Sequence, residues 1–372
     1  MDHKMKTLDT PCIVVDWARM SENIRKMQAA ANSFNCACRP HIKTHKSVEI
    51  AKMQLAAGAV GISCAKTSEA EVFADGGIED IFIAYPLIGK SKLDRALSIQ
   101  KKVKRLILAI DSVEGAQALS DFAVAENTKF EARIEIDTGL KRTGAVHSKL
   151  CEIGEAIRKL PGIDVTGVYT FKSLLYKGQA TTSVQAAGEE EGQLIKVAAN
   201  TLRDLDFDIR DISAGSTPTG LSVAKTGLVN EIRPGTYVFH DWMTNLQGVC
   251  EEIDIAAYIA ATVVSTPTPS LAVVDAGVKA LAADVRLNVP PIPLPGFARV
   301  VGRDDLILDR SNEEHGIIRT ATNGGETGLK IGDTLKLIPA HICTAINLQD
   351  YFFADDGGSL RRIKVDARGR VW

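Results

Sequence analysis

Residues 80–111 read DIFIAYPLIGKSKLDRALSIQKKVKRLILAID, and this stretch indicates the fold of the larger part of the chain. Two runs that are apolar almost throughout, 80–85 and 105–111, flank a segment at 90–101 whose apolar residues recur at helical spacing. A strand that is apolar on both faces is typical of a parallel sheet covered by helices. The stretch therefore predicts one strand–helix–strand unit of an α/β fold.

The same alternation continues on both sides of this unit. Further strands are predicted at 59–65, 130–137, 164–170, 211–214 and 229–232, and further helices at 67–76, 112–125, 147–159 and 181–205. Thr67 and Ser112 are the expected caps of two of these helices. Eight or so units in about 240 residues fit a closed barrel better than an open sheet. We therefore expect a (β/α)8 TIM-type barrel over residues 1–245.

The pattern changes near Trp242. From residue 247 onward there is little helical periodicity, and strand-like runs recur between proline and glycine turns, at 257–265, 271–274, 298–301, 305–308, 316–319, 334–338 and 363–366. This pattern predicts a C-terminal all-β domain over residues 246–372. An early β-rich run at 10–16 is a candidate to join that domain.

Composition narrows the class of protein. The 372 residues are 45% apolar and 24% charged with a net charge of −2, which argues against nucleic acid or an anionic membrane as the main partner. No run approaches the ~18 apolar residues of a membrane span, and the N-terminus has no apolar signal region. The seven cysteines form an odd, scattered set and not a disulfide framework, so we expect a protein of the reducing cytoplasm.

The stretch RPHIKTHKS at 39–47 is the strongest candidate site. Pro40 favours extended backbone, so Lys43 is expected at or just after the end of a strand, pointing into the crevice where α/β folds bind ligands. Neighbouring cations would help its ammonium lose a proton, as a Schiff-base lysine requires. The alternatives are a solvated basic turn and a phosphate-binding patch without covalent chemistry.

Other candidates follow later strands of the predicted barrel. Arg142, in IEIDTGLKRTG (134–144), could present a cation to a ligand oxygen or merely pair with Asp137. The segments SAGSTPT (213–219) and RPGTY (233–237) offer amides and hydroxyls for a phosphate, although such sequences are also ordinary turns. Tyr169 and Tyr176 flank another strand end, and each could simply be a packing residue with its hydroxyl at the surface.

The last cluster is PAHICT at 339–344. On an extended segment His341 and Cys343 would lie on one face, two residues apart. Imidazole and thiolate suit Zn²⁺ with coordination positions left open. The alternative is a buried cysteine beside a surface histidine.

Together these motifs resemble one family, the fold-type III pyridoxal-phosphate enzymes with an alanine-racemase-like barrel, and within it the eukaryotic-type D-serine dehydratases and D-threonine aldolases. The resemblance runs through nearly the whole chain, through TPCIVVD (10–16), RPHIKTHK (39–46), EIDTGLKRTG (135–144), SAGSTPT (213–219), EIRPGTYVF (231–239), VVDAGVKALAAD (273–284), EEHG (313–316) and PAHICT (339–344). It implies that Lys43 binds pyridoxal 5'-phosphate covalently and that Arg142 faces the phenolic oxygen of the ring. It also implies cofactor contacts for Tyr169, Tyr176, Thr217, Gly235 and Thr236, and zinc ligation by His341 and Cys343.

The activity that this resemblance implies is the dehydration of a D-3-hydroxy amino acid, similar to D-serine, to a 2-oxo acid and ammonia by a homodimeric lyase. The alternatives are a metal-dependent D-threonine or 3-hydroxy-D-aspartate aldolase using Mn²⁺ or Mg²⁺, a racemase or epimerase, and a non-catalytic cofactor-binding protein. Relatives that act as aldolases tend to carry an acid in place of Cys343.

One segment departs from the family. YTFKSLLYKG (169–178) has Phe171, Lys172 and two leucines where relatives usually carry small or polar residues and a histidine. This wall is expected to face the substrate. Lys172 could bind a second carboxylate of the substrate or equally lie in solvent.

Overall fold

The computed structural model describes residues 7–322 and 324–372. The chain divides into two compact units. The α/β unit comprises Arg25–Lys43, Val48–Gly235 and Arg370–Trp372, and the β unit comprises the residues up to Ile24, Thr44–Ser47 and Thr236–Gly369. The boundary near the N-terminus falls within helix α1 (Trp17–Ser33).

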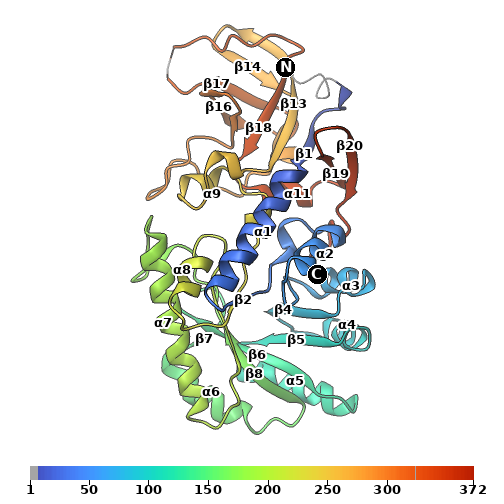
Figure 1. The fold of residues 1–372 in the computed structure, drawn as a ribbon, viewed down its shortest axis with the longest axis vertical. Coiled ribbons are helices and arrows are strands. Elements are labelled where there is room, and N and C mark those ends of the chain that lie inside the picture. The colour runs from blue at the N-terminus through green and yellow to red at the C-terminus, as the bar shows by residue number, and fades with distance from the viewer. Residues whose placement is uncertain (1–6, 323) are drawn as a thin grey trace. The chain divides into compact units, whose positions relative to one another are not determined.

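The α/β unit is built on a nine-stranded parallel sheet, seen edge-on through its labelled strands in Figure 1. Its order is β2 (Ala37–Cys38), β12 (Glu231–Ile232), β11 (Asp211–Ser213), β8 (Ile163–Tyr169), β6 (Phe130–Asp137), β5 (Arg105–Ile110), β4 (Asp80–Pro86) and β3 (Ile62–Cys64), with β7 (Ala145–Val146) beside β6. The segments around β2 and β3, the first and last strands in this order, are hydrogen-bonded to each other. Ser63 N donates to Pro40 O at 2.8 Å, and Val60 N donates to Cys38 O at 3.0 Å. The predicted α/β architecture with a parallel sheet is confirmed, and the sheet is curled.

Helices cover the outer face of this sheet, as Figure 1 shows for α4 to α7. They are α2 (Val48–Ala56), α3 (Thr67–Asp75), α4 (Lys90–Gln100), α5 (Val113–Ala125), α6 (Leu150–Ile157), α7 (Val184–Arg203) and α8 (Gly220–Lys225). Ser112 caps α5 by accepting from Gly115 N at 3.3 Å, as predicted. The predicted cap of α3 is wrong, because Lys66 holds the cap position and Thr67 is already helical.

The inner face of the curled sheet carries paired charges rather than a purely apolar filling. Glu231 on β12 accepts from Arg39 Nε at 2.7 Å and from Arg133 Nη1 at 2.5 Å. Arg39 also pairs with Asp80 at 2.5 Å, and Arg133 with Asp211 at 2.8 Å. Both arginines are almost completely buried. Buried charges of this kind need the complete set of partners, so the strands that carry them are tied to one register.

The β unit contains a second nine-stranded sheet. Its order is β14 (Leu271–Val274), β17 (Gly316–Thr320), β16 (Arg303–Ser311), β15 (Ala298–Val300), β18 (Thr334–Pro339), β13 (Ala257–Thr268), β1 (Cys12–Asp16), β19 (Tyr351–Asp355) and β20 (Leu360–Lys364). Its neighbours pair antiparallel except β1 and β19, which are parallel. The C-terminal antiparallel β architecture is confirmed. Three short helices in this unit lacked a periodic signal: α9 (Trp242–Leu246), α10 (Val278–Leu281) and α11 (Ile342–Asn347).

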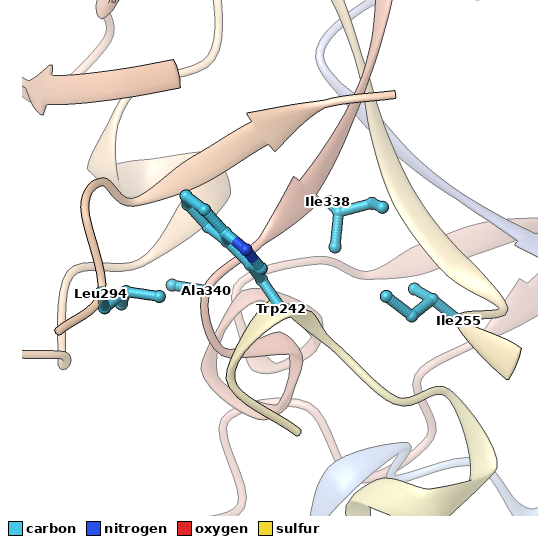
Figure 2. Packing of buried hydrophobic residues seen from close by; sticks show 5 residues of the cluster. All are labelled: Trp242, Ile255, Leu294, Ile338 and Ala340. Atoms are coloured by element: carbon cyan, nitrogen blue, oxygen red, sulfur yellow. The ribbon is translucent and has the colours of Figure 1, made fainter. Parts of the chain in front are cut away.

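A small apolar cluster anchors the end of β18. Figure 2 shows the Trp242 indole among the side chains of Ile255, Leu294, Ile338 and Ala340, all buried. Met243 N also donates to Ala340 O at 3.2 Å. The chain therefore leaves β18 from a packed position immediately before residue 341. Within the described residues, no helix is long and apolar enough to cross a membrane.

Candidate active site

Lys43 lies in a short 3-10 turn, Ile42–Thr44, which follows β2 and the isolated β-bridge between His41 and Ser63. Its ammonium is 5.6 Å from the centroid of the Phe171 ring. Arg39 was expected among the cations near the Lys43 ammonium, and this prediction is wrong. Its guanidinium is paired with the carboxylates of Asp80 and Glu231 inside the sheet. The cation that does share the surroundings of Lys43 is Arg142, whose guanidinium lies 4.9 Å from the same ring.

Arg142 does not make the predicted alternative contact with Asp137. Asp137 Oδ1 instead accepts from Gly139 N at 2.9 Å and Lys141 N at 3.0 Å, which shapes the loop after β6. This loop presents the Arg142 guanidinium to the face of Phe171. Phe171 thus lies against two cations, one of them the candidate cofactor lysine, and both contacts are of the cation–π type.

Tyr169 ends β8 and is buried, so the surface position predicted as an alternative for its hydroxyl is wrong. The hydroxyl donates to Glu135 Oε2 at 2.8 Å, and the ring makes an edge contact with Phe82 at 4.9 Å. Burial and the neighbouring carboxylate raise the pKa of Tyr169 above its ordinary value, and burial raises the pKa of Glu135. Tyr169 is therefore a neutral hydrogen-bond donor held by one partner.

Tyr176 occupies a different kind of position. It belongs to the two-stranded hairpin of β9 (Leu175–Tyr176) and β10 (Gln179–Ala180), and it is exposed. The Lys177 ammonium lies 5.3 Å from its ring. Its role toward a cofactor stays a prediction.

Thr217 and Gly235 come together as a pair of polar groups. Gly235 N donates to Thr217 Oγ1 at 3.1 Å, and this contact is buried. Arg233, nearby in the chain, donates to Ser213 Oγ at 2.8 Å and to Thr170 O at 2.5 Å, which ties the loops after β8, β11 and β12 together. A hydroxyl beside a backbone amide is a donor set that fits a phosphate group. These residues therefore fit the phosphate of the cofactor.

His341 and Cys343 interact, but not in the predicted geometry. His341 is extended, with φ −141° and ψ 111°, and precedes α11, while Cys343 is already in that helix. Cys343 Sγ lies 3.1 Å from Thr44 Oγ1 and 3.5 Å from Thr236 Oγ1. Burial alone would raise the pKa of Cys343, but the adjacent His341 lowers it below its ordinary value.

Two aspartates position this pair. Asp284 Oδ2 lies 2.6 Å from His341 Nδ1, and its other oxygen accepts from Thr344 Oγ1 at 2.8 Å. Asp241 Oδ2 accepts from Ile342 N at 3.2 Å, which fixes the turn between the two side chains. Among residues 7–322 and 324–372, no group of three or more His, Cys, Asp or Glu side chains is arranged to hold a metal. The pair fits Zn²⁺ as one imidazole and one thiolate ligand, with positions left for other groups.

The solvent position predicted as one alternative for Lys172 is wrong. Its side chain is 1% exposed, and its ammonium is paired with Glu190 on α7. It also donates to Leu175 O at 2.8 Å and to Ala187 O at 3.4 Å. Its contacts are therefore with the hairpin and with α7, and it is not solvated.

Sequence reasoning missed Asp284, Glu135 and Glu190. Asp284 ends the quoted motif VVDAGVKALAAD, and a carboxylate in that motif was the available signal. Glu135 lies in a mostly buried strand, so a charge flanked there by Ile134 and Ile136 was also a signal. Glu190 lies in a run of three glutamates on α7, and the run does not distinguish it from its neighbours.

The fold of both units is that of the alanine-racemase-like proteins. The family described as "Alanine racemase, N-terminal domain" matches residues 15–241, and the family described as "Putative serine dehydratase domain" matches residues 256–354. The chain therefore belongs to the fold-type III pyridoxal-phosphate enzymes, in the group that joins these two domains.

Named relatives span the whole chain. The D-threo-3-hydroxyaspartate dehydratase of Delftia sp. (strain HT23) is 35% identical over 92% of this chain and 93% of its own. Its solved structure matches with a TM-score of 0.90, covering 99% of each chain. The 3-hydroxy-D-aspartate aldolase of Paracoccus denitrificans (strain Pd 1222) is 29% identical over 98% of this chain and 93% of its own. The D-serine dehydratase of Dictyostelium discoideum is 29% identical over 93% of each.

Proposed function

We propose that this protein is a pyridoxal-phosphate- and zinc-dependent lyase that dehydrates a D-3-hydroxy amino acid to a 2-oxo acid and ammonia. The observation that carries the proposal is the placement of His341, whose Nδ1 lies 2.6 Å from Asp284 Oδ2, two residues before Cys343. Thiolate and imidazole favour zinc over the harder ions that carboxylates attract. One solved structure similar to this chain is a cysteine-to-alanine mutant of a D-threo-3-hydroxyaspartate dehydratase in the metal-free form, which supports a thiol-containing metal site in that relative.

The reaction breaks the Cα–H and Cβ–O bonds of the substrate, and hydrolysis of the resulting enamine releases ammonia. Bound pyridoxal phosphate supplies a sink for the electron pair left at Cα. Bound zinc supplies a Lewis acid for the departing hydroxyl. Lys43 Nζ is the group proposed to take the Cα proton. Thr217 and Gly235 hold the phosphate, together with Thr236.

A second carboxylate on the substrate is consistent with the charges of the α/β unit. Lys141 and Arg142 follow β6, and Lys177 lies in the hairpin after β8, a strand that neighbours β6 in the sheet. All three of these cationic side chains are exposed. Together with the likeness to a D-threo-3-hydroxyaspartate dehydratase, they support 3-hydroxy-D-aspartate as the proposed substrate. Lys172 is not assigned a direct contact with this carboxylate, because Glu190 already pairs with its ammonium.

The second candidate function is an aldolase that cleaves the Cα–Cβ bond to give glycine and an aldehyde, using Mn²⁺ or Mg²⁺. It is favoured by the likeness to the 3-hydroxy-D-aspartate aldolase of Paracoccus denitrificans. The imidazole and thiolate pair at His341 and Cys343 argues for dehydration instead.

Some finer features belong to the same proposal. We infer that the curled sheet closes as a (β/α)8 barrel, a reading supported by the hydrogen bond from Ser63 N to Pro40 O. The proposed domains are residues 1–245 and 246–372, with β1 pairing within the sheet of the second. A homodimer in the cytoplasm remains the proposed state of the enzyme.

The test is a product assay. Purified protein loaded with pyridoxal phosphate and Zn²⁺ is given D-serine, D-threonine and 3-hydroxy-D-aspartate separately, and 2-oxo acid, ammonia, glycine and aldehyde are measured. Dehydration that is abolished by a chelator and restored by Zn²⁺ supports the proposal, and Cys343→Asp should weaken the dependence on zinc. Glycine and an aldehyde as main products would favour the aldolase. Exchange of the Cα proton with inversion, indifferent to the chelator, would favour a racemase.

A further inference from the structure

Lys172 is a buried lysine near the candidate site, and its side chain is 1% exposed. Its partners come from two places. Glu190 and Ala187 O belong to α7, and Leu175 O belongs to β9. The ammonium thus joins the hairpin that follows β8 to the helix that packs beside it.

Glu190, on α7, contacts both Lys172 and the turn of the hairpin. Its carboxylate is only partly buried, at 21% exposure, and its two oxygens lie 3.1 Å from Lys177 N in the turn of the hairpin. One carboxylate therefore binds both the buried ammonium before the hairpin and the backbone of its tip. A buried ammonium needs such a partner, because an unpaired charge there is strongly unfavourable.

The residue immediately before Lys172 is Phe171, which lies against Lys43 and Arg142. The backbone from 171 to 174 has no regular structure, and Ser173 has a positive φ of 63°. Neither a strand nor a helix holds Phe171 in place. The polar contacts of Lys172 are what tie this stretch to α7.

We propose that Lys172 is a positioning residue whose ion pair with Glu190 holds Phe171 against Lys43 and Arg142 and thereby sets the substrate side of the site. In this arrangement substrate preference depends on an apolar ring kept in place by a buried charge. The inference rests on the proposed function for its kinetic consequences, whereas the coupling of the hairpin to α7 can be measured without turnover.

The experiment compares Lys172→Met, Glu190→Gln and the double variant Lys172→Met/Glu190→Gln with the wild-type holoenzyme. Methionine keeps the length of the side chain and removes its charge. We expect KM for 3-hydroxy-D-aspartate to rise about tenfold in Lys172→Met, with kcat changed less than about threefold. The double variant should be no worse than the poorer single variant, because the two side chains act through one contact. Glu189→Gln is the matched control, since Glu189 is the exposed neighbour on the same helix.

Hydrogen exchange of the cofactor-free chain gives a second readout. Amides of residues 173–181 should exchange at least about tenfold faster in Lys172→Met than in wild type, while α7 keeps its protection. The double variant removes both charges, so it tests the proposal even if Glu190→Gln fails to fold around an unpaired ammonium. Unchanged exchange together with unchanged KM would overturn the proposal, as would purely additive effects in the double variant. A wild-type protein without lyase activity would refute the proposed function. The hydrogen-exchange result alone would then decide whether Lys172 has the proposed positioning role.

Discussion

Asp284 Oδ2 lies 2.6 Å from Nδ1 of His341, and this contact determines which imidazole nitrogen is left for a metal. A carboxylate that accepts from Nδ1 fixes the tautomer and leaves Nε2 as the ligand atom. The same carboxylate accepts from Thr344 Oγ1 at 2.8 Å, so its own orientation is fixed as well. In the proposed zinc site, Asp284 thus orients the His341 imidazole and strengthens it as a ligand.

The first prediction concerns this carboxylate. Asp284→Asn removes the negative acceptor, and we expect zinc affinity to fall about 10- to 100-fold. Competition with a chromophoric chelator measures the affinity directly. Asp304→Asn is the control in the same unit, because the Asp304 side chain is 84% exposed. Equal zinc affinity in Asp284→Asn and wild type would contradict the role assigned to Asp284.

The second prediction concerns the phosphate of the cofactor. Thr217→Val removes the hydroxyl that lies beside Gly235 N, and we expect cofactor binding to weaken by about 1–3 kcal/mol. Titration of the cofactor-free protein, followed by its visible absorption, gives the dissociation constant. Thr217→Ser keeps the hydroxyl and should bind almost as wild type does. A dissociation constant unchanged in Thr217→Val would remove Thr217 from the cofactor site.

Local patterns predicted most of the elements of this chain. The strand expected at 130–137 has those bounds in the structure, and Ser112 caps α5 as expected. Such features depend on neighbouring residues, so periodicity and capping preferences report them. The short helix α11 was missed because Asp241, far away in the sequence, accepts the amide of Ile342 and turns the chain there.

The sequence indicated candidate residue types for the site, but it did not indicate their supporting contacts. The motif around His341 and Cys343 indicated a metal pair, and the structure brings these two side chains together. The contact of Asp284 with His341 joins residues 57 positions apart. The environment of Lys172 likewise depends on how α7 packs on the hairpin. Periodicity shows which face of an element is buried, and it does not show which partner a buried charge finds.

The third prediction concerns the buried pair of Tyr169 and Glu135. Tyr169→Phe removes the hydroxyl that donates to Glu135 Oε2 and leaves a buried carboxylate oxygen without that donor. We expect the free energy of unfolding to fall by about 1–3 kcal/mol. Tyr176→Phe is the matched control on an exposed ring, with an expected change within about 0.5 kcal/mol. Urea unfolding of the cofactor-free proteins measures both, and equal stabilities for the two variants would contradict the importance of this hydrogen bond.

The last prediction concerns the charges inside the curled sheet and the dependence of stability on pH. Burial alone would raise the pKa of Glu231, but Arg133 and Arg39 lower it well below its ordinary value. A carboxyl whose pKa is lower in the folded than in the unfolded state stabilises the fold above the unfolded pKa of about 4.3. That contribution is lost progressively as pH falls below this value, because the folded protein must then accept a proton on a paired carboxylate.

Glu231→Gln should therefore change both the stability and its pH dependence. At pH 7 we expect it to destabilise the protein by about 3–5 kcal/mol, because Arg39 and Arg133 lose a shared buried partner. Between about pH 5 and pH 3 the variant should lose less stability than wild type, since the titrating group is absent. Glu79→Gln, at an exposed ion pair with Lys104, should change stability by less than about 1 kcal/mol. Urea unfolding followed by circular dichroism across this pH range is the measurement, and parallel pH profiles for Glu231→Gln and wild type would show that Glu231 does not contribute to the acid sensitivity of the fold.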